Sequence, residues 1–142
     1  MTNTIGEAIV EYLLSLPAVT DLIDERLYPN VAPQDIDKPT LVYQLIDAQH
    51  VASRSGSSHL ARSLFQFTCE ADTYAEADAL AAAVRSAYED YRNVAILQMR
   101  IDGALIINEL DEYSEMHATH VVRLDVAFWH SDNIIIEQEA TT

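Results

Sequence analysis

Regular alternation of apolar and polar residues in two long segments is the feature that most constrains the fold. In an extended strand every second side chain lies on the same face, so this alternation predicts strands with one buried face. Across residues 60–71 the apolar set is Phe65, Phe67 and Cys69, and across residues 119–130 it is Val122, Leu124, Val126 and Phe128. The sequence therefore predicts a sheet with one apolar face that a second layer must cover.

Two other segments have the residue spacing of amphipathic helices. Thr4 and Glu7 have the spacing of a capping box, so the first helix is expected to begin near Thr4. A second capping box, at Thr73 and Glu76, opens the clearer helix. The apolar stripe of this second helix consists of Ala77, Leu80, Ala81, Val84, Ala87, Tyr88 and Tyr91. Its small alanines allow the helix to lie close against a sheet.

The remaining segments predict shorter strands and polar connections. Pro17 is expected to end the first helix or to start a turn, and residues 41–47 have the composition of a well-covered strand. Asp102-Gly103 lies between two apolar runs and is typical of a hairpin turn, because glycine accepts a positive φ at little cost. A bulge within one long strand is the alternative. Residues 111–118 are predicted to form a polar turn.

Together these elements predict an α+β fold. The expected architecture is an antiparallel sheet of about four to five strands, with two amphipathic helices packed on one face. A closed barrel is disfavoured, because the apolar stripes of the helices need a partner. We expect residues 1–142 to form a single domain, with flexible ends at residues 1–3 and 137–142, since no linker or internal repeat divides the chain.

The charge of the chain is unusually negative. It has 23 acidic residues against 8 lysines and arginines, for a formal net charge of -15. Such a chain repels a nucleic-acid backbone, so specific DNA binding is not expected. Two interpretations of the acidity are compatible: adaptation to a salt-rich host, and an acidic lining that keeps passing DNA from binding. The even spread of the acids along the chain favours adaptation to salt.

The sequence contains no motif of catalysis or cofactor binding. It has neither a nucleophile elbow nor a phosphate-binding glycine loop. His117 and His120, with Glu112 and Glu115 nearby, are acceptable metal ligands, but residues three apart in a strand point to opposite faces. We therefore predict no catalytic, cofactor or metal site. No membrane span or secretion signal is expected either.

Two segments and one single residue are candidates for contacts with protein partners. A locally basic loop between two strands and an apolar segment near the C-terminus have the composition of contact segments. Arg62 is one of the basic residues of this loop, and Trp129 lies on the strand face opposite Phe128, where exposed apolar surface indicates a partner. The other candidates in the two segments are Arg54, Ser55, Gly56, Ser57, His59, Ile134, Ile135 and Ile136. A disordered loop tip and a strand of the chain's own sheet remain the alternatives.

The order of these elements and their local sequence motifs resemble those of the tail-completion family of tailed phages. The similarity covers roughly residues 5–130, and no single piece of it is specific. The matching segments are residues 19–23 (VTDLI), 26–29 (RLYP), 38–44 (KPTLVYQ), 65–71 (FQFTCEA) and 73–77 (TYAEA). The heavy acidity departs from the family and points to an unusual host, such as a haloarchaeon.

The resemblance implies a structural virion protein at the head–tail junction, assembled in the host cytoplasm. It implies a ring, of about six subunits, that completes the tail tube, joins it to a neck or head-completion protein and lets genomic DNA pass without specific binding. Its expected partners are copies of itself, the tail-tube protein and the neck protein, with no cofactor. The alternatives are an oligomeric regulatory domain that binds a small ligand between sheet and helices, and a metal-dependent hydrolase using the histidines and acids near residues 111–120.

Overall fold

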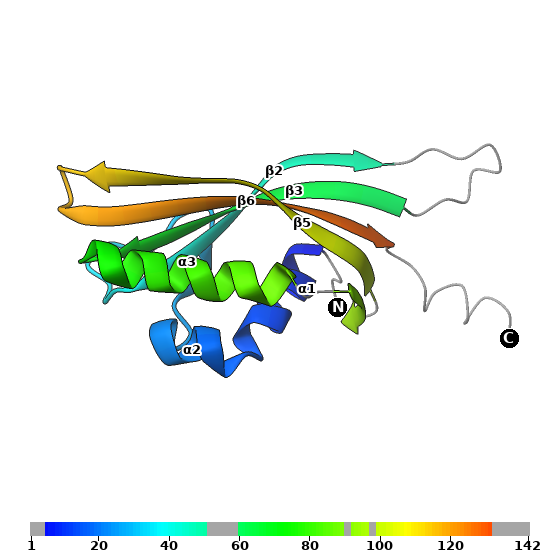
Figure 1. Ribbon diagram of the computed structural model, residues 1–142, viewed down its shortest axis with the longest axis horizontal. Helices are drawn as coiled ribbons and strands as arrows, with labels where there is room; N and C mark the ends of the chain where they lie inside the picture. Colours follow the sequence, from blue (N-terminus) through cyan, green and yellow to red (C-terminus); the bar gives the residue numbers. More distant parts are fainter. Residues whose placement is uncertain (1–4, 51–59, 90–91, 97–98, 132–142) are drawn as a thin grey trace, which may run out of the picture.

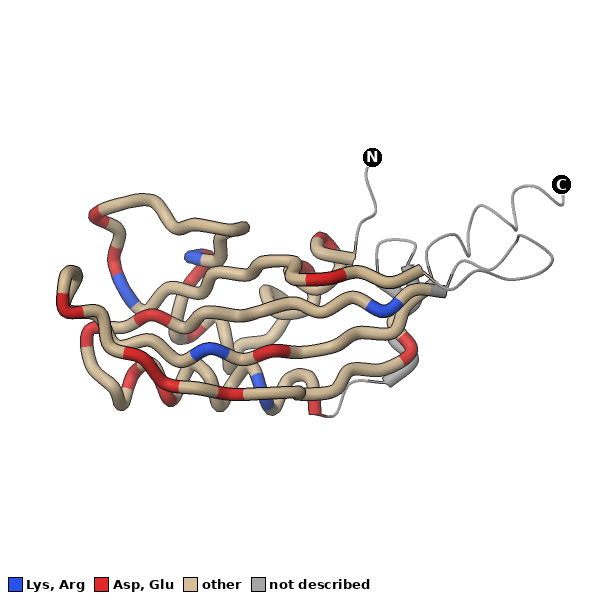
Figure 2. Tube along the Cα trace, turned by 90° about the horizontal axis from the view of Figure 1, so that it is seen from above, with Lys and Arg blue, Asp and Glu red and all other residues tan. Residues whose placement is uncertain are grey.

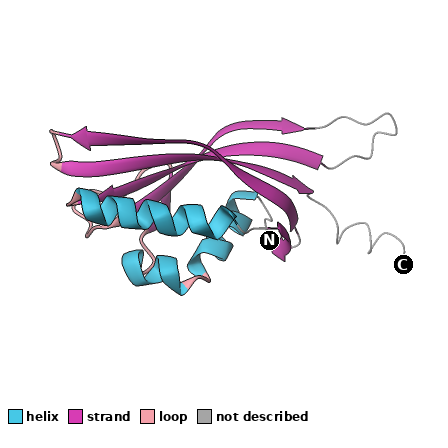
Figure 3. Cartoon of the chain, in the orientation of Figure 1, coloured by secondary structure: helices cyan, strands magenta, loops and turns pink. Residues whose placement is uncertain are grey.

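In the part of the chain that the structure describes, a long twisted sheet forms one layer and three helices form the other (Figures 1 and 3). The computed structural model describes residues 5–50, 60–89, 92–96 and 99–131. All three helices lie on the same side of the sheet. We call that side the helix-covered face and the opposite side the helix-free face. The α+β class and the helices on one face are as the sequence predicts.

The helices are α1 (Ile5–Leu14), α2 (Pro17–Ile23) and α3 (Tyr74–Glu89). The predicted cap of α3 is confirmed, because the backbone N–H of Glu76 donates to Thr73 Oγ1 at 3.2 Å. The predicted cap at Thr4 lies outside the described residues. Pro17 opens a helix of its own rather than only ending α1, since proline fits the first helical position, where no backbone donor is needed.

The strands are β1 (Leu27–Pro29), β2 (Thr40–His50), β3 (Leu60–Ala71), β4 (Arg92–Ile96), β5 (Met99–Ser114) and β6 (Thr119–Ser131). Their order in the sheet is β1-β2-β3-β6-β5-β4. Strands β2 to β6 pair antiparallel, and the short β1 pairs parallel with β2. Strand β6, the last described strand along the chain, therefore lies in the middle of the sheet, between β3 and β5.

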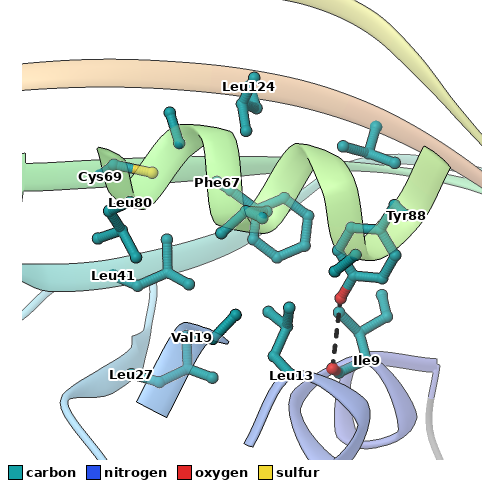
Figure 4. Close-up of a cluster of buried hydrophobic side chains, with 14 of the residues drawn as sticks. Ile9, Leu13, Val19, Leu27, Leu41, Phe67, Cys69, Leu80, Tyr88 and Leu124 are labelled. Carbon is teal, nitrogen blue, oxygen red and sulfur yellow. Dashed lines mark hydrogen bonds between the residues drawn. The ribbon is translucent and has the colours of Figure 1, made fainter. Parts of the chain in front are cut away.

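The hydrophobic core lies between the helices and the helix-covered face (Figure 4). The ring of Tyr88 on α3 lies 5.6 Å from that of Phe67 on β3 and 5.0 Å from that of Phe128 on β6, measured between centroids. The Tyr88 hydroxyl donates to the carbonyl of Ile9 at 3.4 Å, which ties α3 to α1. The apolar side chains that alternation predicted for the buried faces of β3 and β6 are therefore the ones that lie in the core.

The structure corrects the predicted hairpin at Asp102-Gly103. Both residues lie inside β5, where the register against β6 shifts between Ile101 and Gly103. The β4–β5 connection instead comes earlier, at residues 97–98, which lie outside the described residues. The bulge considered as the alternative is therefore correct, because extra residues in a long paired strand are accommodated as bulges.

Strand β5 also extends further than the sequence predicts. It continues to Ser114, so the polar turn is confined to the end of the predicted segment 111–118. Residues 111–114 stay extended because they pair with β6. Their polar composition by itself favours a turn, so the sequence did not predict this extension of the strand.

Candidate functional site: the helix-free face and edges of the sheet

Toward the β5–β6 turn, the helix-free face carries a ladder of paired polar side chains. The guanidinium of Arg123 donates to Thr68 Oγ1 at 3.1 Å and to the carboxylate of Glu112. In the next row, Gln66 Nε2 donates to Asp125 Oδ1 at 3.1 Å. The ladder crosses β3, β6 and β5, so its polar groups are satisfied within the chain.

Toward the opposite end, the same face becomes apolar. The strand register aligns Leu64 of β3 with Ala127 of β6 and with Leu105 of β5. Trp129 follows in the next row, and both Trp129 and Leu105 are exposed. The guanidinium carbon of Arg62 lies 5.7 Å from the centroid of the Trp129 ring, a cation–π arrangement. Exposed apolar side chains beside an arginine–tryptophan pair are typical of a contact surface.

Two of the predicted contact residues are thus brought together, because Arg62 and Trp129 are direct partners in the β3–β6 register. The sequence suggested them for separate reasons, one for its charge and one for its apolar surface. The other predicted contact residues lie outside the described residues: Arg54, Ser55, Gly56, Ser57, His59, Ile134, Ile135 and Ile136. Their role in contacts stays a prediction.

An open groove of about 730 Å³ lies over the polar end of this face. One wall is the segment from residue 30 to 38, and the floor includes side chains of β2, β3 and β6. Lys38, His117 and Arg123 line the groove together with Asp35 and Glu70. The ligand-binding alternative expected a pocket between the sheet and the helices, whereas this groove is on the other side and is lined by charges of both signs.

The two histidines considered as metal ligands lie on opposite sides of the sheet. His117 lines the groove on the helix-free side. His120 lies at the helix-covered face, where its ring centroid is 4.7 Å from that of Tyr113 and 6.3 Å from that of Tyr74. The described residues contain no group of three or more histidine, cysteine or acidic side chains that could hold a metal ion.

Ser63 and His130 form a pair of the chemical types that hydrolases use. Ser63 Oγ lies 2.9 Å from His130 Nε2, across β3 and β6. Each residue is only 2% exposed, however, so a substrate cannot reach the hydroxyl. The pair therefore satisfies two buried polar groups rather than offering a nucleophile.

Cys69 is equally inaccessible. It is fully buried on the helix-covered face of β3. Burial raises the pKa of its thiol well above the usual range, and the charges of Glu109 and Glu70 raise it further. A thiol that stays protonated is a poor nucleophile.

Acidic residues are spread along the sheet and its connections, and basic residues are few (Figure 2). Where acids occur on β5, donors from neighbouring elements accompany them. Arg85 of α3 donates to Glu109 at 2.7 Å, and the Tyr74 hydroxyl donates to Asp111 at 3.0 Å. That hydrogen bond and the charge of Asp111 raise the pKa of Tyr74.

Comparison with known protein families identifies the chain. Residues 7–131 match the family described as Tail completion protein gp17. The chain belongs to this tail completion family. It is therefore a structural, non-enzymatic component of the virion tail, as the sequence resemblance implied.

The structural comparison agrees in fold. A chain of the solved structure "Virion of native gene transfer agent (GTA) particle" superposes on this tail completion protein with a TM-score of 0.69 and 18% sequence identity. The match covers 89% of this chain and 94% of that chain. No curated protein sequence matches the chain. Within the described residues, no helix is long and apolar enough to cross a membrane.

Sequence reasoning missed the apolar margin of β5. Leu105, Ile107 and Leu110 belong to the apolar run that follows Asp102-Gly103, for which the sequence predicted no contact surface, and all three are exposed. The sequence did contain a signal: residues 104–110 have apolar residues on both faces of a strand and no lysine or proline. An edge strand without these residues is typical of one that a partner covers.

Proposed function

We propose that this tail completion protein forms a ring that ends the tail tube and joins it to the neck of the particle, with DNA passing through the centre. The observation that carries the proposal is the family match over residues 7–131. The near-complete correspondence with a chain from a gene transfer agent particle supports it, because the shared region spans both chains.

The distribution of polar and apolar surface supports a role in assembly. The helices and the helix-covered face bury the core between them, which leaves the helix-free face, the connections and the strand margins for partners. Arg62 and Trp129 provide an exposed contact pair on that face. Copies of the chain, the tail-tube protein and the neck protein are the partners that such surfaces would contact.

The negative charge suits a protein that surrounds DNA without binding it. A net charge of -15 per copy repels phosphates, so the genome would meet little attraction to the channel wall. Adaptation to a salt-rich host would produce the same composition, and both interpretations stay part of the proposal.

Deletion of the gene and complementation test this function. Without the protein, we expect tails of irregular length or heads and tails that fail to join, seen by negative-stain electron microscopy. Wild-type protein supplied in trans should restore complete particles, and labelled protein should lie at the junction. Intact, infectious particles without the protein would refute the proposal.

A pair of matched variants tests the contact surface. Trp129→Ala removes an exposed aromatic side chain from the helix-free face, and Met116→Ala removes an exposed aliphatic side chain from the β5–β6 turn. We expect Trp129→Ala to complement at least about tenfold less well, because interface tryptophans carry much of a binding energy. Met116→Ala should complement normally, and equal complementation by the two variants would exclude Trp129 from the interface.

A further inference from the structure

The sheet has two long strand margins that no described strand covers. Strand β4 pairs with β5 only as far as Gly103, so the outer margin of residues 104–114 has no strand partner within the described chain. Strand β1 pairs only with residues 41–43 of β2. The outer margin of residues 44–50 therefore also has no strand partner within the described chain. These stretches lie on opposite borders of the sheet and extend to opposite ends of the molecule (Figure 1).

Neither margin carries lysine or proline, although Glu109 and Asp111 of β5 are acids on the helix-covered face. Exposed edge strands are commonly guarded by lysine, proline or inward-pointing charge. Residues 44–50 (QLIDAQH) and 104–114 (ALIINELDEYS) contain no lysine, arginine or proline. Each margin has a bulge, another device that can protect an edge, but the extra residue in each bulge is an isoleucine. Ile46 and Ile107 are both 48% exposed.

The acids on the β5 margin are paired within the chain. Glu109 is bonded to Arg85 and Glu112 to Arg123, while Asp111 accepts from the Tyr74 hydroxyl. Such exposed pairs add little stability. Their consequence is that an approaching neighbour meets less negative charge on β5 than the net charge of the protein suggests.

Electrostatics also favours β2 as the neighbour over a second β5. Two β5 margins placed together would bring two segments that each carry Glu109, Asp111 and Glu112 side by side, and like charges on neighbouring strands are unfavourable. The free part of β2 contains one acid, Asp47, and ends at His50. A β2 margin is therefore the better partner for a β5 margin.

We propose that the outer margin of β5 in one copy pairs with the outer margin of β2 in the next, which joins the sheets into one continuous sheet. This rests on the ring proposed above. The contact uses two different surfaces of the chain, so it is heterologous, and repeating it generates a closed ring when the rotation closes. The added strand pairing supplies backbone hydrogen bonds, and Ile46 and Ile107 become buried at the junction.

Cross-linking between two variants, each with one added cysteine, tests this pairing. Ile46→Cys and Ile107→Cys each place one reactive thiol on one margin, and the native Cys69 does not compete because it is fully buried. A short bis-maleimide tolerates small differences in register. We expect covalent dimers when the two variants are mixed and assembled, and none when either variant is assembled alone.

A second pair of variants keeps the added charge constant. Ile107→Asp places a charge on the β5 margin, and Met116→Asp places the same charge on the β5–β6 turn, at a residue that is 87% exposed. Ile107→Asp should weaken self-association at least about tenfold, and Met116→Asp less than about twofold. Thermal unfolding of each variant checks that its fold is intact.

The outcomes separate the pairing from the proposed function. Cross-linked dimers from Ile107→Cys alone, equal effects of the two aspartates, or a chain that stays monomeric at millimolar concentration would overturn the pairing. So would the absence of mixed dimers in tails that still carry the protein at their ends. Particles completed without the protein would instead overturn the proposed function itself.

Discussion

At the scale of single residues, the face on which a side chain lies decides its chemistry. Cys69 and Thr68 are neighbours on β3, yet the thiol is enclosed in the core and the hydroxyl accepts from Arg123 on the helix-free face. Alternation along the strand causes this difference. The same reasoning separates the buried Phe128 from the exposed Trp129.

We predict that the Cys69 thiol is unreactive in the folded protein at pH 8.5. Burial raises the pKa of the thiol, so it stays protonated at a pH where an ordinary cysteine ionises. Reaction then requires unfolding, which costs at least about 5 kcal/mol in typical domains. Modification by a chromogenic disulfide reagent should be on the order of a thousandfold slower than in urea-unfolded protein.

An added surface thiol provides the control for this measurement. Met116→Cys places a cysteine at an exposed position of the β5–β6 turn, and one equivalent of thiol should then react rapidly while Cys69 stays protected. Two rapidly reacting equivalents in the folded variant would show that the core around Cys69 opens readily.

At the scale of secondary-structure elements, local chemistry defines α3 while long-range pairing defines β5. The Thr73 cap lies where the sequence spacing places it, because both partners of a cap lie within one helical turn. The extent of β5 instead depends on β6, which pairs with it from Arg100 to Ser114.

Substitution of Thr73 by alanine should destabilise the protein by about 0.5–2 kcal/mol. The variant loses the oxygen that accepts the Glu76 N–H at 3.2 Å, so a backbone donor at the start of α3 loses its protein partner. Urea denaturation followed by circular dichroism measures the change.

Thr73→Ser keeps the accepting hydroxyl and is the matched control. Its free energy of unfolding should stay near the wild-type value, because serine and threonine both cap helices well. Equal stability of the alanine and wild-type proteins would show that the cap contributes little to the fold.

At the scale of the whole molecule, the charge of the chain opposes its own assembly. Each copy carries a formal net charge of -15, so neighbouring copies repel one another. Contacts within a ring must overcome this repulsion. The paired acids of β5 and the screening of the remaining charge by salt both reduce it.

Self-association should therefore strengthen as salt is added. Raising the ionic strength from about 0.01 M to 0.15 M shortens the screening length from about 30 Å to about 8 Å. We expect the apparent dissociation constant from sedimentation velocity to fall several-fold. An uncharged solute at equal osmolality should not reproduce the effect, and weaker association in salt would show that ion pairs between copies dominate.

The sequence by itself determined helices α1 and α3, strands β3 and β6, and the face that each of them buries. Phe67, Leu124 and Tyr88 fall in the core because period-two and helical spacing are properties of neighbouring residues, and they fix side-chain directions before any strand is paired. Of the candidate contact surface, the sequence identified Arg62 and Trp129 as separate residues.

Tertiary structure alone decided how these pieces combine. The insertion of β6 between β3 and β5 sets Arg62 against Trp129 and places Asp102-Gly103 inside a strand, and it leaves the margins of β2 and β5 without a strand partner among the described residues. Strand order and register depend on contacts between residues far apart in the chain. Local periodicity is the same whichever strands become neighbours, so it does not predict strand order or register.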